Sequence, residues 1–135
     1  METDALAILR RQRHSFLNHL QVISGWLQLA KPERASEYVA RVAARMESDG
    51  QAIRSLTPDL GLVALELSLE AEALGVEVEW RISKPLPDLS PACFKAEVGR
   101  ALENVGRMGD GDRLLVVSLG SDGLTAHSPA QRGER

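Results

Sequence analysis

Residues 10–29, RRQRHSFLNHLQVISGWLQL, decide the fold expected for the N-terminal half of the chain. They lie in a segment, Thr3 to Ala30, with no proline and a single glycine. Apolar side chains recur there in alternating steps of three and four, the spacing of one helix face. The spacing predicts one helix over 3–30, about 40 Å long at ~1.5 Å per residue. The residues of this apolar face, called the seam below, are Leu6, Leu9, Phe16, Leu20, Ile23, Leu27 and Ala30, with Arg13 at the skipped position.

A second helix is predicted directly after the first. Pro32 disfavours helical backbone at Lys31, so the first helix should stop there. An apolar stripe resumes from Glu33 onward, and a short connection makes the two helices antiparallel neighbours. The stripe consists of Ala35, Val39, Val42, Met46 and Ile53.

The predicted hairpin carries more apolar surface than two helices can bury between themselves. His19, Val22, Trp26 and Leu29 widen the seam on one side, and Leu17 widens it on the other. A helical hairpin alone has too small a core to be stable. We therefore expect a two-fold dimer in which two hairpins form a four-helix bundle. The alternative is that the C-terminal half folds back over the second face.

The C-terminal half reads as a small α/β unit. Thr57-Pro58 and Ser90-Pro91 each place a capping hydroxyl before a proline, which marks the start of a helix. Gly75 is a typical helix stop. The expected order is helix 57–75, strand 76–82, loop 85–88, a helix from 90 to about 105, turn 109–112, strand 114–119, turn 120–123 and strand 124–126.

The fold class is therefore α+β. The predicted domains are a helical hairpin over 1–56, a small α/β domain over 57–128 and a polar tail over 129–135.

Composition restricts the function. The 135 residues suit one compact domain or two very small ones, and the net charge of −3 gives no reason to expect nucleic acid as a partner. The single cysteine, Cys93, excludes an internal disulfide and a Cys-rich metal site. No apolar run reaches the ~20 residues of a membrane span, and Glu2 and Asp4 stand where a signal peptide would be apolar. We expect a cytoplasmic protein without a membrane partner.

His14 is the residue with the clearest chemical potential. It lies off the seam, with Asn18 one turn on and Gln21 two turns on, and Arg10, Arg11 and Arg13 crowd the preceding turn. An imidazole is nucleophilic near neutral pH and forms an N–P bond that is labile enough to pass on. Guanidinium groups attract an anionic partner surface. Most exposed helical histidines nevertheless have no chemical role.

The string from Arg13 to Leu29, followed by Ala35-Ser36-Glu37-Tyr38-Val39, resembles a known family. It is similar to the SpoOB-type phosphoacceptor hairpin of the sporulation phosphotransferase B and of the citrate/malate-type sensor histidine kinases. The shared pattern is Arg-His-acid-aromatic or Met-x-Asn-x-Leu-Gln, then an apolar stretch with Gly and Leu-Gln-Leu. The resemblance implies that His14 is phosphorylated, that the hairpin forms a homodimeric bundle, and that response-regulator receiver domains are the partners.

One position departs from the family pattern. The family usually has Asp or Glu after the histidine, where this chain has Ser15. In the kinases that acid is thought to assist autophosphorylation, so its absence weakens a kinase assignment more than a phosphotransfer assignment. Asn18 matches the family and is expected to support His14. The residues expected to contact the partner are Arg10, Arg11, Arg13, Ser15 and Gln21.

The second half is then interpreted as a truncated, degenerate ATP-binding domain of the kinase type. Asn104 stands where the family's Mg²⁺-binding asparagine would be, and Ser121-Asp122-Gly123 echoes a glycine box within an expected hairpin turn. No backbone cradle for phosphates can be identified, so we expect no ATP binding of functional strength. No intrinsic cofactor or metal is expected, and Mg²⁺ would come with the receiver.

The predicted function is a phosphorelay histidine phosphotransferase. It would pass a phosphoryl group between receiver aspartates in sporulation-type signalling, without ATP-dependent kinase activity of its own. The alternative is a non-catalytic dimeric regulator that binds a receiver or a kinase, and an intact kinase core is a third possibility. Among the other side chains, His19, Trp26 and Trp80 are interpreted as packing, Cys93 as buried, and His127 as part of the tail.

Overall fold

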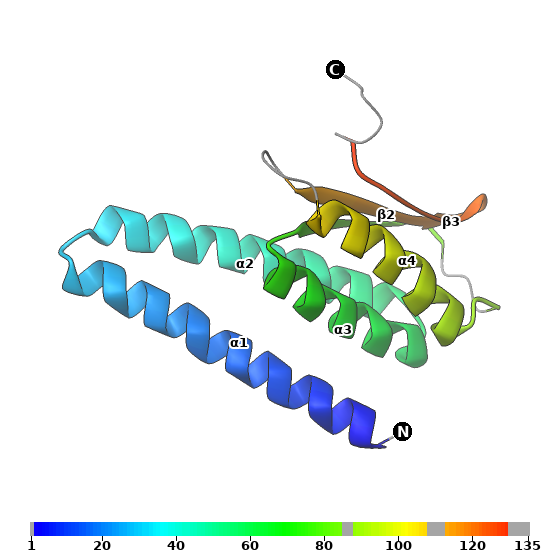
Figure 1. Cartoon of the computed structure of the whole chain (residues 1–135), viewed down its shortest axis with the longest axis horizontal. Coiled ribbons are helices and arrows are strands. Elements are labelled where there is room, and N and C mark those ends of the chain that lie inside the picture. The colour runs from blue at the N-terminus through cyan, green and yellow to red at the C-terminus, as the bar shows by residue number, and fades with distance from the viewer. Residues whose placement is uncertain (1, 85–87, 108–112, 130–135) are drawn as a thin grey trace. The chain divides into compact units, whose positions relative to one another are not determined.

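The computed structural model describes residues 2–84, 88–107 and 113–129. It divides into two compact units, Met1–Ser48 and Asp49–Arg135, and the division falls inside the second helix. The expected order of elements is confirmed, while residues 85–87, 109–112 and 130–135 of the predicted loop, turn and tail lie outside the described residues. The elements are α1 (Glu2–Gln28), α2 (Pro32–Ser55), α3 (Pro58–Leu74), β1 (Glu77–Ile82), α4 (Pro91–Gly106), β2 (Leu114–Gly120) and β3 (Gly123–His127) (Figure 1).

The turn between α1 and α2 is closed by backbone hydrogen bonds. The Lys31 N–H donates to the Trp26 carbonyl at 2.9 Å, and the Ala30 N–H donates to the Leu27 carbonyl at 3.0 Å. This is the pattern that ends many helices with one left-handed residue, usually glycine. Here Ala30 takes that position with φ of 60°, so α1 ends at Gln28 rather than Ala30. Pro32 then begins α2, as expected.

In the first unit α1 contacts α2 through an inner face that borders the seam. The His19 ring is hydrogen-bonded to the Tyr38 hydroxyl, and the Arg34 guanidinium lies 5.4 Å from the centre of the Trp26 ring. Ala35, on α2, is buried. The residues on this side of α1 are Ile8, which is buried, and Gln12, Ser15, His19, Ile23 and Trp26, which are half-buried.

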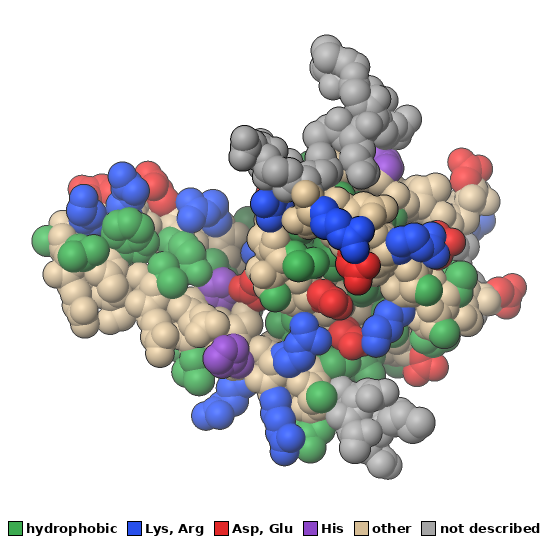
Figure 2. All heavy atoms as spheres, viewed as in Figure 1, with side chains coloured by type: hydrophobic (Ala, Val, Ile, Leu, Met, Phe, Trp, Pro, Cys, Tyr) green, Lys and Arg blue, Asp and Glu red, His purple; other side chains and the backbone are tan. Residues whose placement is uncertain are grey.

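Most of the seam remains on the surface of the single chain, and of its residues only Ile23 is half-buried. Leu20 is 59% exposed and Leu27 is 55% exposed, although both are large apolar side chains. Figure 2 shows hydrophobic side chains on the surface of the hairpin. The apolar stripe predicted for α2 is also only partly covered: Val39 and Met46 are exposed, and Ala35 is buried. The other exposed members of the seam are Leu6, Leu9 and Phe16.

The predicted helix signals of the second unit are confirmed. The Thr57 hydroxyl accepts from the Leu60 N–H at 3.4 Å, and the Ser90 hydroxyl accepts from the Cys93 N–H at 2.9 Å. Gly75 ends α3 in the left-handed region with φ of 72°. The N–H of Val76 then donates to the Ala71 carbonyl at 2.8 Å. Local sequence thus sets the ends of these helices.

The described strands form one sheet in the order β1-β2-β3. β1 and β2 are parallel, with Val78 opposite Leu115, and β2 and β3 are antiparallel. Helices α3 and α4 cover one face of the sheet (Figure 1). Phe94 of α4 is fully buried there, beside Trp80 of β1. The core between the layers includes Leu60, Leu67, Phe94, Val98, Leu102, Val105, Leu115, Val117 and Leu119.

The last turns of α2 belong to this second core. Leu56 is buried in it, and Ile53 packs against it. The Trp80 indole N–H of β1 donates to the Asp49 carboxylate at 3.0 Å. A Cβ at Gly61 of α3 would lie 3.2 Å from the Ile53 carbonyl oxygen, so the absent side chain lets α3 approach α2 closely. The domain boundary predicted at 56/57 lies at the end of α2, eight residues beyond the division between the compact units.

Two interpretations of single residues are wrong. Cys93 is exposed, because Phe94 takes the inward position in the first turn of α4. His127 is the last residue of β3 and is half-buried, because the strand continues one residue beyond the predicted end. Among the described residues, the helices are too short or too polar to cross a membrane.

Gly75→Ala should lower the free energy of unfolding by about 1–2 kcal/mol, because an L-residue pays that cost in the left-handed region. Gly99→Ala is the matched control, since Gly99 lies inside α4 with no atom within 4 Å of an added Cβ. It should raise stability by up to about 1 kcal/mol. Urea unfolding checks both, and equal effects of the two substitutions would contradict the analysis.

Candidate functional site

His14 lies on an exposed polar face in the middle of α1. Arg10, Asn18 and Gln21 lie on the same side of the helix, at spacings of four, four and seven residues from it. All four side chains are exposed, and this set is called the polar face below. The face lies away from the inner face that contacts α2, because each residue turns the helix by about 100°. A large partner can therefore reach the imidazole directly.

The electrostatic setting of His14 is cationic. Arg10, Arg11 and Arg13 are all exposed in the turn before it. The sequence holds no Asp or Glu between Asp4 and Glu33, so no acid of α1 offsets these charges near the histidine. An anionic group approaching His14 is attracted by the three guanidinium groups.

Ser15 is not brought together with the polar face. It follows His14 in sequence, and the helical turn places it on the half-buried inner face. A side chain on that face is less accessible to a partner than Asn18 or Gln21. Of the residues predicted to contact the partner, Ser15 is thus the one whose placement differs from the rest.

A polar contact across the hairpin was not predicted. The His19 Nδ1 and the Tyr38 hydroxyl are 2.5 Å apart, and their ring centres are 5.6 Å apart. The Arg41 guanidinium lies 5.6 Å from the centre of the Tyr38 ring. The sequence predicts only packing for His19. The sequence does offer one indication of this contact. His19 and Tyr38 lie at similar distances along the chain from the turn, and residues placed in this way face each other in an antiparallel pair of helices.

The two segments that resemble parts of a nucleotide site, Asn104 and Ser121-Asp122-Gly123, lie on different elements. Asn104 is exposed in the last turn of α4, and its carbonyl accepts from the Arg107 N–H at 3.3 Å. Ser121 and Asp122 form the turn between β2 and β3, where Gly120 pairs with Gly123. In the part of the chain that the structure describes, no three His, Cys, Asp or Glu side chains are grouped so that they could hold a metal ion.

Residues 2–55 match the family model described as the sensor kinase SpoOB-type, alpha-helical domain. The matched segment comprises α1 and α2, and the match confirms the resemblance predicted from the hairpin sequence. It indicates a role in two-component signalling. Comparison with curated proteins and with solved structures gives no significant match.

The His19–Tyr38 contact should stabilise the hairpin. Tyr38→Phe keeps the ring and removes the hydroxyl, and we expect it to lower the free energy of unfolding by about 1 kcal/mol. A double-mutant cycle with His19→Ala should give a coupling energy of about 0.5–1.5 kcal/mol. Additive losses in thermal or urea unfolding would show that the two side chains do not stabilise each other.

Proposed function

We propose that this chain, whose first two helices match the SpoOB-type domain, is a histidine phosphotransferase of a bacterial phosphorelay. The observation that carries the proposal is the exposed His14, which lies in a helix of the family-matched segment. Three arginines precede His14, and the sequence has no Asp or Glu between Asp4 and Glu33. By resemblance to the sporulation phosphotransferase, the signalling pathway is of the sporulation type. The phosphoryl donor and the acceptor are aspartates of receiver domains.

In the proposed reaction the lone pair of one ring nitrogen of neutral His14 attacks the phosphorus of a receiver's aspartyl phosphate. The N–P bond forms as the P–O bond to the aspartate breaks, and the electron pair stays on the receiver's carboxylate. The reverse step delivers the phosphoryl group to the aspartate of a second receiver. Catalysis of this kind rests mainly on positioning and charge stabilisation.

The remaining residues of the polar face assist this reaction. Asn18 lies one turn after His14 and can donate a hydrogen bond to a phosphoryl oxygen. Gln21 extends the docking surface by a further turn. Arg10, Arg11 and Arg13 attract the acidic rim of the receiver and raise its association rate. The chain supplies no cofactor, and the receiver brings Mg²⁺ in its own acidic pocket.

The proposed active form is a homodimer. The exposed seam of α1, together with Val39 and Met46 of α2, is an apolar surface wide enough to pack against a second hairpin. Two copies related by a two-fold axis would bury it in a four-helix bundle and leave the polar faces outside. We place this dimer in the cytoplasm.

A second candidate is a non-catalytic dimer that binds a receiver or a histidine kinase and regulates it. Ser15 favours this candidate, because the family usually has an acid at that position. The same surface would then bind the partner without forming phosphohistidine.

The decisive test is transfer from a phosphorylated receiver. Incubation with a panel of receivers labelled at their aspartates should transfer acid-labile label to the chain, and His14→Gln should abolish the transfer. His127→Gln is the control, because His127 lies in β3 of the other unit. Label retained in His14→Gln would refute the assignment of the phosphoacceptor.

Binding separates the two candidate functions. If His14→Ala loses transfer but keeps its affinity for the receiver, the phosphotransferase is supported. If the parent chain binds a receiver and never forms phosphohistidine, the non-catalytic regulator is correct.

The dimer makes a separate prediction. The chain should sediment as a dimer at micromolar concentration, and Leu20→Glu should weaken the dimer at least about tenfold, because it buries a charge in the seam. Gln28→Glu is the matched control, since it adds a charge of the same sign to α1 at an exposed position that continues the polar side of the helix, seven residues after Gln21. A monomeric parent chain would refute the shared bundle.

A further inference from the structure

The sheet face opposite α3 and α4 carries a polar row that crosses all three described strands. The strand register places Arg81 of β1 opposite Ser118 of β2, and Ser118 opposite Thr125 of β3. The neighbouring side chains Ile82, Leu119 and Leu124 belong to the core on the helical side. Because side chains alternate between the faces of a strand, Arg81, Ser118 and Thr125 share the face away from the helices.

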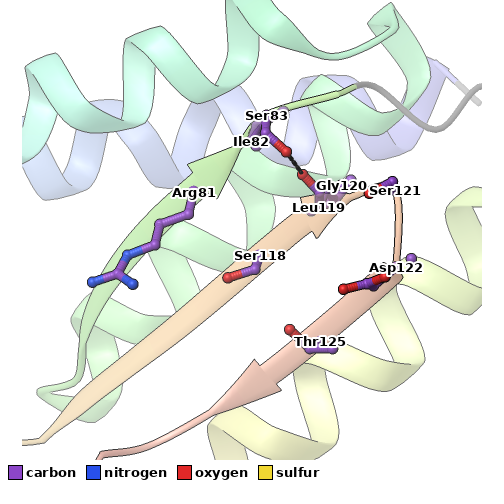
Figure 3. A pocket seen from close by; sticks show the side chains of 10 residues that line it. Arg81, Ile82, Ser83, Ser118, Leu119, Gly120, Ser121, Asp122 and Thr125 are labelled. Atoms are coloured by element: carbon purple, nitrogen blue, oxygen red, sulfur yellow. Dashed lines mark hydrogen bonds between the residues drawn. The ribbon is translucent and has the colours of Figure 1, made fainter.

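This row forms one wall of a pocket of about 500 Å³, called the sheet pocket below. The remaining wall comes from Ser83 at the end of β1 and from Asp122 in the β2–β3 turn. Figure 3 shows the Arg81 side chain extending back along β1, away from the β2–β3 turn, and the Asp122 carboxylate turned back from the turn toward Thr125. Charged and hydroxyl groups from four chain segments therefore meet at one concave surface.

The floor of the pocket is bare backbone. Gly120 pairs with Gly123, so two glycines lie side by side at the end of the sheet. A Cβ at Gly120 would come within 2.7 Å of the Ser83 Oγ, which donates to the Leu119 carbonyl at 3.2 Å. Any side chain at Gly120 would displace Ser83, so glycine keeps this contact and leaves the floor open.

Side-chain hydrogen-bond donors outnumber carboxylate acceptors in the sheet pocket. The Arg81 Nε donates to Glu79 at 2.7 Å on an open surface, and within the described residues the two terminal guanidinium nitrogens have no protein partner. The same holds for the hydroxyls of Ser118 and Thr125. Neighbouring strands lie about 4.8 Å apart, so Ser118 is one strand spacing from both Arg81 and Thr125. The long Arg81 side chain would turn toward Ser118 when an anion binds between the hydroxyls. Asp122 is the one carboxylate among the residues that line the pocket, and Glu79 is a second carboxylate next to it, at the Arg81 guanidinium.

We propose that the sheet pocket binds inorganic phosphate as its monohydrogen ion. The Arg81 guanidinium would donate to two phosphate oxygens, the geometry that this planar group favours. The hydroxyls of Ser118 and Thr125 would donate to the remaining oxygens. Asp122 would accept the proton of a monohydrogen phosphate, so the pocket should prefer phosphate over sulfate, which carries no proton at neutral pH. The site is separate from His14, which lies in the other compact unit.

The test is a titration of the full chain with inorganic phosphate, followed by NMR of the backbone amides. Amide shifts should concentrate at residues 81–83 and 118–125, with saturation. Arg81→Met should weaken phosphate binding at least about tenfold. Arg100→Met is the matched control, because Arg100 is an exposed arginine on α4, in the helical layer. Unchanged thermal melting without phosphate verifies that each variant folds.

Sulfate provides the second arm of the experiment. The parent chain should bind it at least about tenfold more weakly than phosphate, and Asp122→Asn should remove most of this preference. Glycerol phosphate, a phosphomonoester with a second pKa of about 6, carries almost no proton on its phosphate group at neutral pH and should also bind more weakly than phosphate, so tighter binding of the ester would contradict the role of Asp122. Shifts confined to other parts of the chain, equal losses in Arg81→Met and Arg100→Met, or no saturable shifts would overturn the proposal and leave a merely solvated sheet face.

Discussion

The rest of this structure depends on one constraint: α1 carries more apolar surface than α2 covers. The inner face around His19 and Trp26 contacts α2, and the seam around Phe16 and Leu20 stays on the surface of the single chain. Only the remaining side of α1 is polar, and His14 lies on it. The position of the histidine therefore follows from the apolar pattern as much as from its own chemistry. A nucleophile on the inner face would be partly covered by α2, and one in the seam would lie among apolar side chains.

Local signals in the sequence predicted the elements, and the structure confirms them. The hydroxyl–proline pairs at Thr57 and Ser90 begin helices, and Gly75 ends one, because each acts on backbone groups within a few residues. The exposure of His14 was predictable for the same reason, since helical periodicity alone separates it from the seam. Ala30 is the local exception: it takes a left-handed position that sequence reasoning would assign to glycine.

Three features that sequence reasoning missed involve residues distant in the chain. The His19–Tyr38 contact needs the register of two antiparallel helices, and Asp49 meets Trp80 only after β1 has folded against the end of α2. The sheet pocket depends on strand order as well, because Arg81 and Ser118 become neighbours only when α4 brings β2 parallel to β1. Cys93 was mispredicted for a local reason. It is exposed while the next residue of the helix, Phe94, is buried, and the sequence pattern did not separate these two adjacent positions.

The division between the compact units falls inside a continuous helix, and this has an evolutionary consequence. A hairpin exchanged by recombination at the end of α2 would take with it Asp49, Ile53 and Leu56, which the second unit uses for its own core and for Trp80. The α/β unit left behind would have to accept foreign residues at those positions. Shuffling of such hairpins among signalling proteins is therefore easiest when the crossover lies within α2, before Asp49, so that each unit inherits its own part of the helix.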